Sequence, residues 1–201
     1  ADLAPLPEAP AFALVAADHP RDAAAVAMLR ADGTILAPSW IDSGTTAVGL
    51  DTTLSSDVVL PTEPCDAGVL TLVDRESRDV VTRIAVPSGE VLAQLRLVAR
   101  GPDLPAFSSN PQDVACIDGT GWVPRFGRSR EADPVPANAG SDLVPLDLAA
   151  GTWDPAARID LAPWGSEVVH PEPREGRAAP HPSSAVALAG GRLVVGLARV
   201  D

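Results

Sequence analysis

A strand-turn-strand pattern occurs three times in this chain. Each copy has a turn that contains Gly33, Gly119 or Gly190, followed by aliphatic, β-branched or aromatic residues that suit a strand. The copies align without gaps. Self-similarity on this scale is typical of repeat proteins, so the sequence predicts an all-β repeat fold. The copies lie at 32–40, 118–126 and 189–197.

A second pattern recurs between these hairpins. Residues 69–74 match 142–147, and residues 83–86 match 158–161. We expect two further strand pairs, 69–73 with 80–86 and 143–148 with 157–161. With the hairpins they form about two and a half units of four antiparallel strands. A short apolar run at 12–16 precedes them as an orphan strand.

Tandem four-stranded antiparallel units are the blades of β-propellers. We therefore expect an incomplete propeller, with blades at about 19–100 and 101–170 and an incomplete blade at 171–201, after an N-terminal linker at 1–18. A propeller needs at least four blades, so the remaining blades would come from the rest of the chain or from a partner chain. A β-sandwich of about ten strands is the structural alternative.

The residues around these strands resemble a known family. Asn110-Pro111-Gln112-Asp113-Val114-Ala115 and the Val73-Asp74 and Leu146-Asp147 strand ends are similar to the YVTN-type propeller repeats of bacterial surface and periplasmic proteins. The resemblance covers most of residues 19–201. The chain departs from the family at the tetrapeptide that gives it its name, which is replaced at 36–39, 122–125 and 193–196.

The spacing of the turns predicts long loops. Gly33 and Gly119 are 119 − 33 = 86 residues apart, and Gly119 and Gly190 are 190 − 119 = 71 apart, whereas a plain blade needs roughly 40 to 50. Because antiparallel strands alternate in direction, the long connections emerge at one face, where a protein or small-molecule ligand would bind. We also expect β-bulges at Pro38 and Pro124. The long connections are 41–67, 87–110, 127–140 and 163–181.

Charge and hydropathy exclude two classes of partner. The net charge of −12 disfavours a nucleic acid or an anionic membrane surface. No run of 18 apolar residues occurs, so we expect no transmembrane segment. Residues 1–10 have the composition of a linker that remains after a signal peptide or lipid-anchor segment is removed, which indicates a periplasmic, cell-surface or secreted protein.

The two cysteines, Cys65 and Cys116, suit a disulfide better than a metal site, because they are few and far apart. In an oxidising compartment a bridge that closes 116 − 65 = 51 residues would contribute roughly 3 to 4 kcal/mol. Two unpaired buried thiols are the alternative.

Candidate contact residues lie on the connection at 163–181. Trp164, His170 and His181 are the candidates for ligand or partner binding, and Trp164 would otherwise pack over the sheet edge. Imidazole and carboxylate side chains could bind a metal there, although a solvated, proline-stiffened loop is the better explanation of these residues. The weak metal candidates are Glu167, His170 and Glu172.

Other acidic residues suggest surface or structural roles. Asp51, Asp57, Glu63 and Asp66 could bind calcium, but their spacing fits no compact binding loop. The repeated Asp74 and Asp147 are better explained as acceptors for turn backbone.

The sequence carries no nucleophile elbow, HExxH pair or phosphate-binding loop. We therefore expect an exported propeller that acts as a binding module, with no cofactor and no assigned catalytic residue. The alternative is the scaffold part of a propeller enzyme of the lactonase-like or haem or metal redox type, with its active site on the same long-loop face. Glu167, His170, Glu172 and His181 would be its first candidates.

Overall fold

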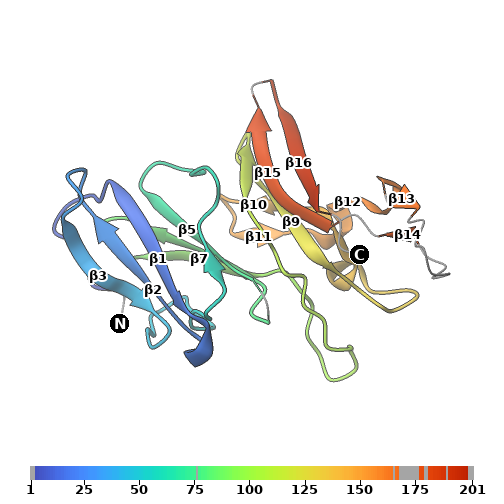
Figure 1. Ribbon diagram of the computed structural model, residues 1–201, viewed down its shortest axis with the longest axis horizontal. Coiled ribbons are helices and arrows are strands. Elements are labelled where there is room, and N and C mark those ends of the chain that lie inside the picture. The colour runs from blue at the N-terminus through green and yellow to red at the C-terminus, as the bar shows by residue number, and fades with distance from the viewer. Residues whose placement is uncertain are drawn as a thin grey trace.

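The protein is all-β, with several antiparallel sheets, none of them closed (Figure 1). The computed structural model describes residues 3–75, 77–164, 166–167, 177–178, 181–188 and 190–198. No helix among these residues is long and apolar enough to cross a membrane.

Sheet I has three strands in the order β1-β2-β3. The run expected to be an orphan strand is β1, which pairs along its whole length with β2. Pro38 lies in the expected β-bulge, because Met28 pairs with Ala37 while Val26 pairs with Ile41. The bounds are β1 (Phe12–Asp18), β2 (Ala23–Leu29) and β3 (Ile35–Asp42), with the 3-10 turn η1 (His19–Arg21) between β1 and β2.

Sheet II has four strands in the order β4-β5-β6-β7. Its central pair is the one expected from residues 69–86. The outer strands were missed, since they lie inside two segments expected to be loops, 41–67 and 87–110. The bounds are β4 (Val58–Val59), β5 (Val69–Asp74), β6 (Val80–Ala85) and β7 (Val91–Arg96).

Sheet III follows the expected order most closely, as β8-β9-β10-β11 with β12 also paired to β10. Its last strand is interrupted by a 3-10 turn. Pro124 is not at a bulge: it pairs in register with Leu143, and the register shifts instead between Gly140 and Asp142. The bounds are β8 (Ala115–Ile117), β9 (Thr120–Arg128), η2 (Pro136–Asn138), β10 (Gly140–Asp147), β11 (Thr152–Trp153), η3 (Pro155–Ala157) and β12 (Ile159–Asp160).

Two hairpins complete the described chain. Sheet IV is the hairpin of β15 and β16, which forms around the third copy of the repeated turn. The other hairpin is made of two short strands after η4. The bounds are η4 (Ala162–Trp164), β13 (Ser166–Glu167), β14 (Arg177–Ala178), β15 (His181–Leu188) and β16 (Arg192–Ala198).

The four sheets pack face to face in chain order (Figure 1). Alternate residues of β5 enter different cores: Leu70 and Leu72 pack with sheet I, whereas Val73 packs with sheet III. Sheet II is therefore covered on both faces. Sheet III is also covered twice, because β15 of sheet IV packs against β9 on the side opposite Val123.

The extra sheet changes the meaning of the repeat spacing. The 86 residues between Gly33 and Gly119 contain a whole additional sheet, so the surplus is not all in loops as expected. The matched segments 69–74 and 142–147 are not equivalent either. Residues 69–74 form β5, the second strand of sheet II, whereas residues 142–147 form most of β10, the third strand of sheet III. Within the stack these two strands run in opposite directions.

The sheets share a common orientation. The turns at Gly33, Gly119 and Gly190, and the segment 60–68, lie at one end of the stack, which we call the turn end. The segments 43–57, 97–110 and 129–139 lie at the other, the loop end, where the last two hang from the lower side in Figure 1. In each sheet one strand starts at the loop end and forms a hairpin with the next strand at the turn end. These hairpins are β2–β3, β4–β5, β8–β9 and β15–β16.

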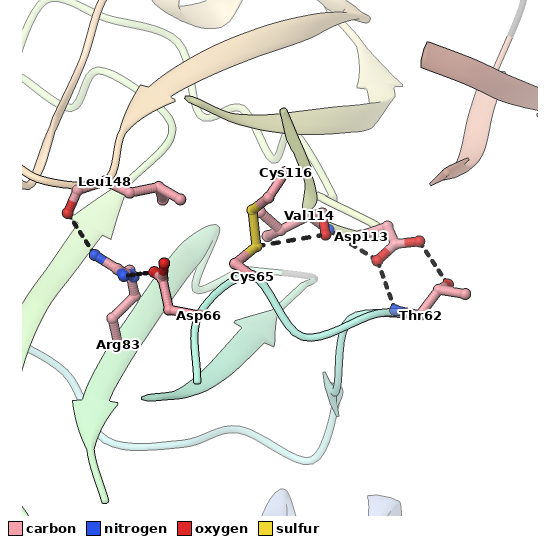
Figure 2. Close-up of a disulfide and its surroundings, with 8 residues drawn as sticks. All are labelled: Thr62, Cys65, Asp66, Arg83, Asp113, Val114, Cys116 and Leu148. Carbon is pink, nitrogen blue, oxygen red and sulfur yellow. Dashed lines mark hydrogen bonds and ion pairs between the residues drawn. A yellow bond between two sulfur atoms is a disulfide. The ribbon is translucent and has the colours of Figure 1, made fainter. Parts of the chain in front are cut away.

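Covalent and polar links join sheets II and III at the turn end (Figure 2). Cys65, between β4 and β5, forms a disulfide with Cys116 of β8, with their Cα atoms 5.3 Å apart. Beside it, the buried Arg83 of β6 donates hydrogen bonds to Asp66 and to the carbonyl of Leu148, just after β10.

Asp113 extends this connection to sheet IV. Its carboxylate accepts hydrogen bonds from the backbone and hydroxyl of Thr62, at 2.9 and 2.7 Å, and from the backbone of Ala185 on β15 at 3.4 Å. A buried carboxylate needs such partners. One side chain thus links three successive sheets.

Candidate functional site

The sequence-predicted contact residues do not come together in the described part of the chain. Trp164 ends η4 and is 62% exposed, and the backbone of His181 starts β15. The backbone of Glu167 lies in β13. The side chains of Glu167 and His181 lie outside the described part, as do residues His170 and Glu172 entirely.

Two of the four acidic residues considered as calcium ligands form separate ion pairs. Asp57 pairs with Arg75 and Asp66 pairs with Arg83. Over residues 3–75, 77–164 and the described stretches after them, no three His, Cys, Asp or Glu side chains gather as a metal site would require.

The repeated aspartates Asp74 and Asp147 both accept structural hydrogen bonds, but their donors differ. Asp147 accepts hydrogen bonds from the backbone of Ala149 and Ala150, which follow it in the turn. Asp74 is buried and accepts instead from the backbone and hydroxyl of Ser55, an earlier loop residue. Burial raises the pKa of Asp74, and the hydrogen bonds from Ser55 oppose that rise.

A cleft of about 480 Å³ opens at the loop end. Residues 104–108 form one wall, and residues 127–138, from the end of β9 into the segment before β10, form much of the other. These segments belong to two of the four connections predicted to meet on one face. We call this cleft the loop-end cleft and treat it as the candidate site.

Asp79 holds the first wall in place. It lies in the turn between β5 and β6 with no exposed side-chain surface. Its Oδ1 atom accepts hydrogen bonds from the hydroxyls of Ser108 and Ser109 and from the backbone of Asn110, at 2.9 to 3.1 Å. The segment that lines the cleft is thereby tied to a sheet.

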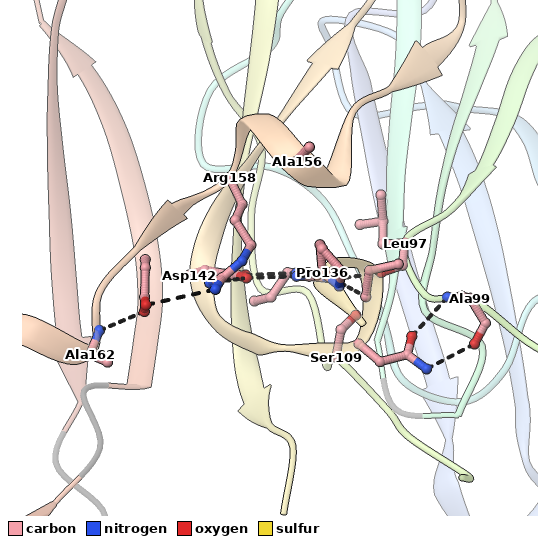
Figure 3. A network of polar contacts seen from close by, with 12 residues as sticks. Leu97, Ala99, Ser109, Pro136, Asp142, Ala156, Arg158 and Ala162 are labelled. Carbon is pink, nitrogen blue, oxygen red and sulfur yellow. Dashed lines mark hydrogen bonds and ion pairs between the residues drawn. The ribbon is translucent and has the colours of Figure 1, made fainter. Parts of the chain in front are cut away.

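Arg125 holds the second wall through partners of which Figure 3 labels Leu97, Pro136 and Asp142. Its guanidinium forms two hydrogen bonds with the carboxylate of Asp142, at 2.7 and 2.6 Å, and neither side chain is exposed. Its remaining donors reach the carbonyls of Leu97, Pro136 and Ala137. All five N–H groups of Arg125 therefore have acceptors, as a buried guanidinium requires.

Two further contacts surround this pair. Arg125 lies over the ring of Trp153, 5.6 Å from its centroid, in a cation–π arrangement. Arg158 approaches the same carboxylate from a partly exposed position, with its Nη1 atom 3.3 Å from Asp142 Oδ2.

Asn138 joins the two segments that carry the walls. Its side-chain oxygen accepts a hydrogen bond from the backbone of Ala99 at 2.8 Å, and its amide nitrogen donates to the carbonyl of the same residue at 3.1 Å. The side-chain amide of Asn138 thus links segments 97–110 and 129–139 in the way a neighbouring strand would.

Two glycines allow the backbones to approach at the base of the cleft. A Cβ atom on Gly127 would lie 2.2 Å from the carbonyl oxygen of Ser108, and one on Gly140 would lie 1.9 Å from that of Gly127. Gly140 also has a φ of +68°, which disfavours other residues.

The cleft surface combines apolar and charged groups. Leu104, Phe107 and Val135 supply apolar area, with Val135 exposed. Two cationic and two anionic side chains stand around them, so the cleft can contact an apolar group and orient a polar one. The charged residues are Arg128, Arg130, Glu131 and Asp133.

A second cleft, of about 450 Å³, lies at the turn end between residues 9–13 and 60–71. Its lining is mostly apolar, and its one charged residue, Asp66, is already paired with Arg83. It therefore offers less to orient a polar ligand than the loop-end cleft does.

Sequence reasoning located the connections that line the cleft and missed the groups that hold it. The one available signal was the pair of charged residues, Arg125 and Asp142, within otherwise apolar strand patterns. No protein-family profile and no curated protein matches this chain.

Proposed function

We propose that this protein is a binding module of the β-propeller class, with sheets I to IV as consecutive blades and the loop-end cleft as its binding site. The stacking supports the propeller class. A two-layer sandwich covers one face of each sheet, whereas sheets II and III are covered on both. The common direction of the four hairpins also suits blades related by rotation around one axis.

The proposed binding role is supported by the buried charged side chains that hold the walls of the cleft. Asp79, Arg125 and Asp142 have no exposed side-chain surface. Asp79 and Arg125 form hydrogen bonds with the segments that line the walls, and Asp142 holds the guanidinium of Arg125. Burying ions is costly, and a polar network of this kind fixes one arrangement of the chain rather than adding much stability. A preorganised cleft binds with less loss of loop entropy.

The ligand class follows from the lining. An apolar patch around Phe107 and Val135 with nearby Arg130 and Asp133 suits a small molecule or a protein segment that has both apolar and charged groups. The same composition gives no reason to favour a nucleic acid, because the charges of the lining balance and the whole chain is acidic.

Export to the periplasm, cell surface or medium belongs to this proposal. The Cys65–Cys116 disulfide supports it, because such bonds persist in oxidising compartments.

The test is a thermal-shift screen of small molecules and peptides against the wild type and two variants. The cleft variant is Arg128→Ala/Arg130→Ala, which removes two charged side chains from the lining. The matched control is Pro61→Ala/Pro64→Ala, which changes the turn-end cleft. A ligand at a hundred times its dissociation constant stabilises the folded state by about 2.7 kcal/mol.

The proposal expects compounds that stabilise the wild type and the control and lose that effect in the cleft variant. Compounds that lose their effect only in the control would place the binding site at the turn end and overturn the proposal.

A further inference from the structure

A further pocket lies at the loop end, on the sheet II side of the segment 104–108. Its volume is about 450 Å³, and residues 104–108 line both this pocket and the loop-end cleft. Its other wall is formed by residues 99–101, after β7, and by Ser77, in the turn between β5 and β6. Among the described residues of its lining, Arg100 alone is charged, so we call it the Arg100 pocket.

The guanidinium of Arg100 is held by two contacts with the β5–β6 turn. Its Nη2 atom donates a hydrogen bond to the carbonyl of Ser77 at 2.6 Å and lies 3.8 Å from Oδ2 of Asp79. That oxygen is buried and has no hydrogen-bond donor among the described residues, so the charge of Arg100 is what balances it. The turn therefore sets the position of the guanidinium.

The turn that holds Arg100 has an unfavourable backbone conformation. Ser77 and Asp79 have φ values of +68° and +57°, in the left-handed region that favours glycine. Strain of this kind persists where the surrounding contacts enforce it, and it is concentrated at binding sites. Here it directs the Ser77 carbonyl and the Asp79 carboxylate to the same guanidinium.

The chain around the pocket is fixed as well. Asn138 forms hydrogen bonds with both backbone groups of Ala99, the residue before Arg100. Ser108, the last residue of the shared wall, donates a hydrogen bond to Oδ1 of Asp79 at 2.9 Å. Because the cation and both walls are already in place, a ligand loses little affinity to the ordering of the pocket.

Part of the guanidinium is available to a ligand. The side chain of Arg100 is 54% exposed, and its Nε and Nη1 atoms have no acceptor among the described residues. Together with the second N–H of Nη2, one of these atoms offers the planar pair of donors that a carboxylate accepts.

The rest of the lining is suited to an apolar group. Leu104 and Phe107 are half-buried in the shared wall, with Pro105 and Ala106 between them. A single guanidinium matches the single charge of a carboxylate, whereas a phosphate group carries nearly two charges. The net charge of −12 also disfavours polyanions.

We propose that the Arg100 pocket binds a monocarboxylate with an apolar body, either a free carboxylic acid or the C-terminus of a peptide. This inference goes beyond the proposed function, because the loop-end cleft has its own cations, Arg128 and Arg130, and either site can bind a ligand without the other.

The experiment is an NMR titration of the isotope-labelled full chain with matched probes. Hydrocinnamate carries a phenyl group and a carboxylate, and hydrocinnamamide has nearly the same shape without the charge. An N-acetylated dipeptide of leucine and phenylalanine, with a free or an amidated C-terminus, distinguishes a peptide from a free acid.

The titration is repeated with three variants, each checked for folding by circular dichroism. Arg100→Gln removes the charge, and Arg100→Lys keeps the charge but loses the planar pair of donors. Arg21→Gln is the matched control, because Arg21 pairs with Asp18 at the surface and does not line the pocket.

We expect hydrocinnamate to shift amides within 99–101 and 104–108, and hydrocinnamamide to shift none of them. Arg100→Gln should raise the dissociation constant at least about tenfold, with Arg100→Lys between it and the wild type, and Arg21→Gln should leave the constant unchanged. Tighter binding of the free-terminus dipeptide than of hydrocinnamate would identify a peptide as the source of the carboxylate, and the reverse order a free acid.

Equal binding of the acid and its amide would overturn the proposal, and this comparison uses the wild type alone, so it needs no variant to fold. Unchanged binding in a folded Arg100→Gln, or no shift with any probe, would overturn it too. Shifts confined to 127–138 would also overturn it, while the loop-end cleft would remain as a binding site.

Discussion

Arg125 of β9 and Asp142 of β10 face each other across the two central strands of sheet III, fully buried and joined by two hydrogen bonds. The same guanidinium binds the carbonyl of Leu97 and those of two residues before β10. The pair therefore connects the centre of the stack to the wall of the loop-end cleft. Removal of this pair should therefore destabilise the fold and disturb the wall of the cleft.

Asp142→Asn should destabilise the protein strongly. The change leaves the charge of Arg125 buried without its counter-ion, which costs about 3 to 5 kcal/mol. Urea unfolding measures the loss. Asp160→Asn is the matched control, because Asp160 pairs with the partly exposed Arg158 and is itself 50% exposed, so about 1 kcal/mol or less is expected. Equal losses in the two variants would contradict the role given to the buried pair.

Removal of the disulfide should lower the free energy of unfolding by roughly 3 to 4 kcal/mol. The bond between Cys65 and Cys116 closes a loop of 51 residues, which restricts the unfolded chain. The comparison is between the wild type with and without reductant and the variant Cys65→Ser/Cys116→Ser. Reductant should lower the urea midpoint of the wild type and leave that of the variant unchanged. A wild type insensitive to reductant would show that the bond does not form.

Gly140→Ala should cost far more than Gly119→Ala. Both glycines have positive φ, of +68° and +80°, so each substitution has a backbone cost of roughly 1 to 2 kcal/mol. At Gly119 the added Cβ meets nothing within 4 Å, whereas at Gly140 it lies 1.9 Å from a backbone oxygen. Chemical unfolding of the two variants gives the comparison. Similar costs would show that the backbones at the base of the cleft do not pack this closely.

Asp74 and Asp42 should affect the pH dependence of stability in opposite ways. Burial raises the pKa of Asp74 above its ordinary 3.8. The folded state then binds more protons than the unfolded state, so stability falls as the pH rises from 3.8 through the folded pKa. Hydrogen bonds from Ser39, Gly44 and Thr45 lower the pKa of Asp42. Its contribution is present above 3.8 and is lost as the pH falls through its folded pKa.

Urea unfolding at about pH 3 and about pH 7 tests these signs. Relative to the wild type, Asp74→Asn should become more stable as the pH rises, and Asp42→Asn should become less stable. A change of the same sign in both variants would contradict the assignment.

The sequence predicted the hairpins well, because a Gly turn between apolar runs is a local signal. The turns at Gly33, Gly119 and Gly190 all form as expected. Only the two central strands of sheet II were predicted. The edge strand β4 gives a weak signal because it has two residues, and a long segment that contains Cys65 separates it from its hairpin partner β5. Its other edge strand, β7, follows a turn that contains Gly89 but lies outside the repeated pattern, so its residues were predicted to be loop.

The segments that line the loop-end cleft were predicted to share one face, but the contact residues were predicted on another connection, as Trp164, His170 and His181. Loop placement follows from strand direction, which alternates, and so the meeting of 97–110 with 129–139 could be foreseen. The pairing of Asn138 with Ala99 and of Arg125 with Leu97 depends on how two sheets pack, which no local pattern encodes. Trp164 drew attention through its residue type, and it lies in a different segment from those that line the cleft.

An NMR fragment screen on the isotope-labelled chain would locate the binding site, because the backbone amides report where a ligand binds whatever its chemical identity. We expect hits to shift the amides of 104–108 and 127–138 together, and Asn138→Leu, which removes the hydrogen bonds to Ala99, to weaken those hits. Hits that cluster at 9–13 and 60–71 instead, and that Asn138→Leu leaves unchanged, would contradict the assignment of the binding site to the loop-end cleft.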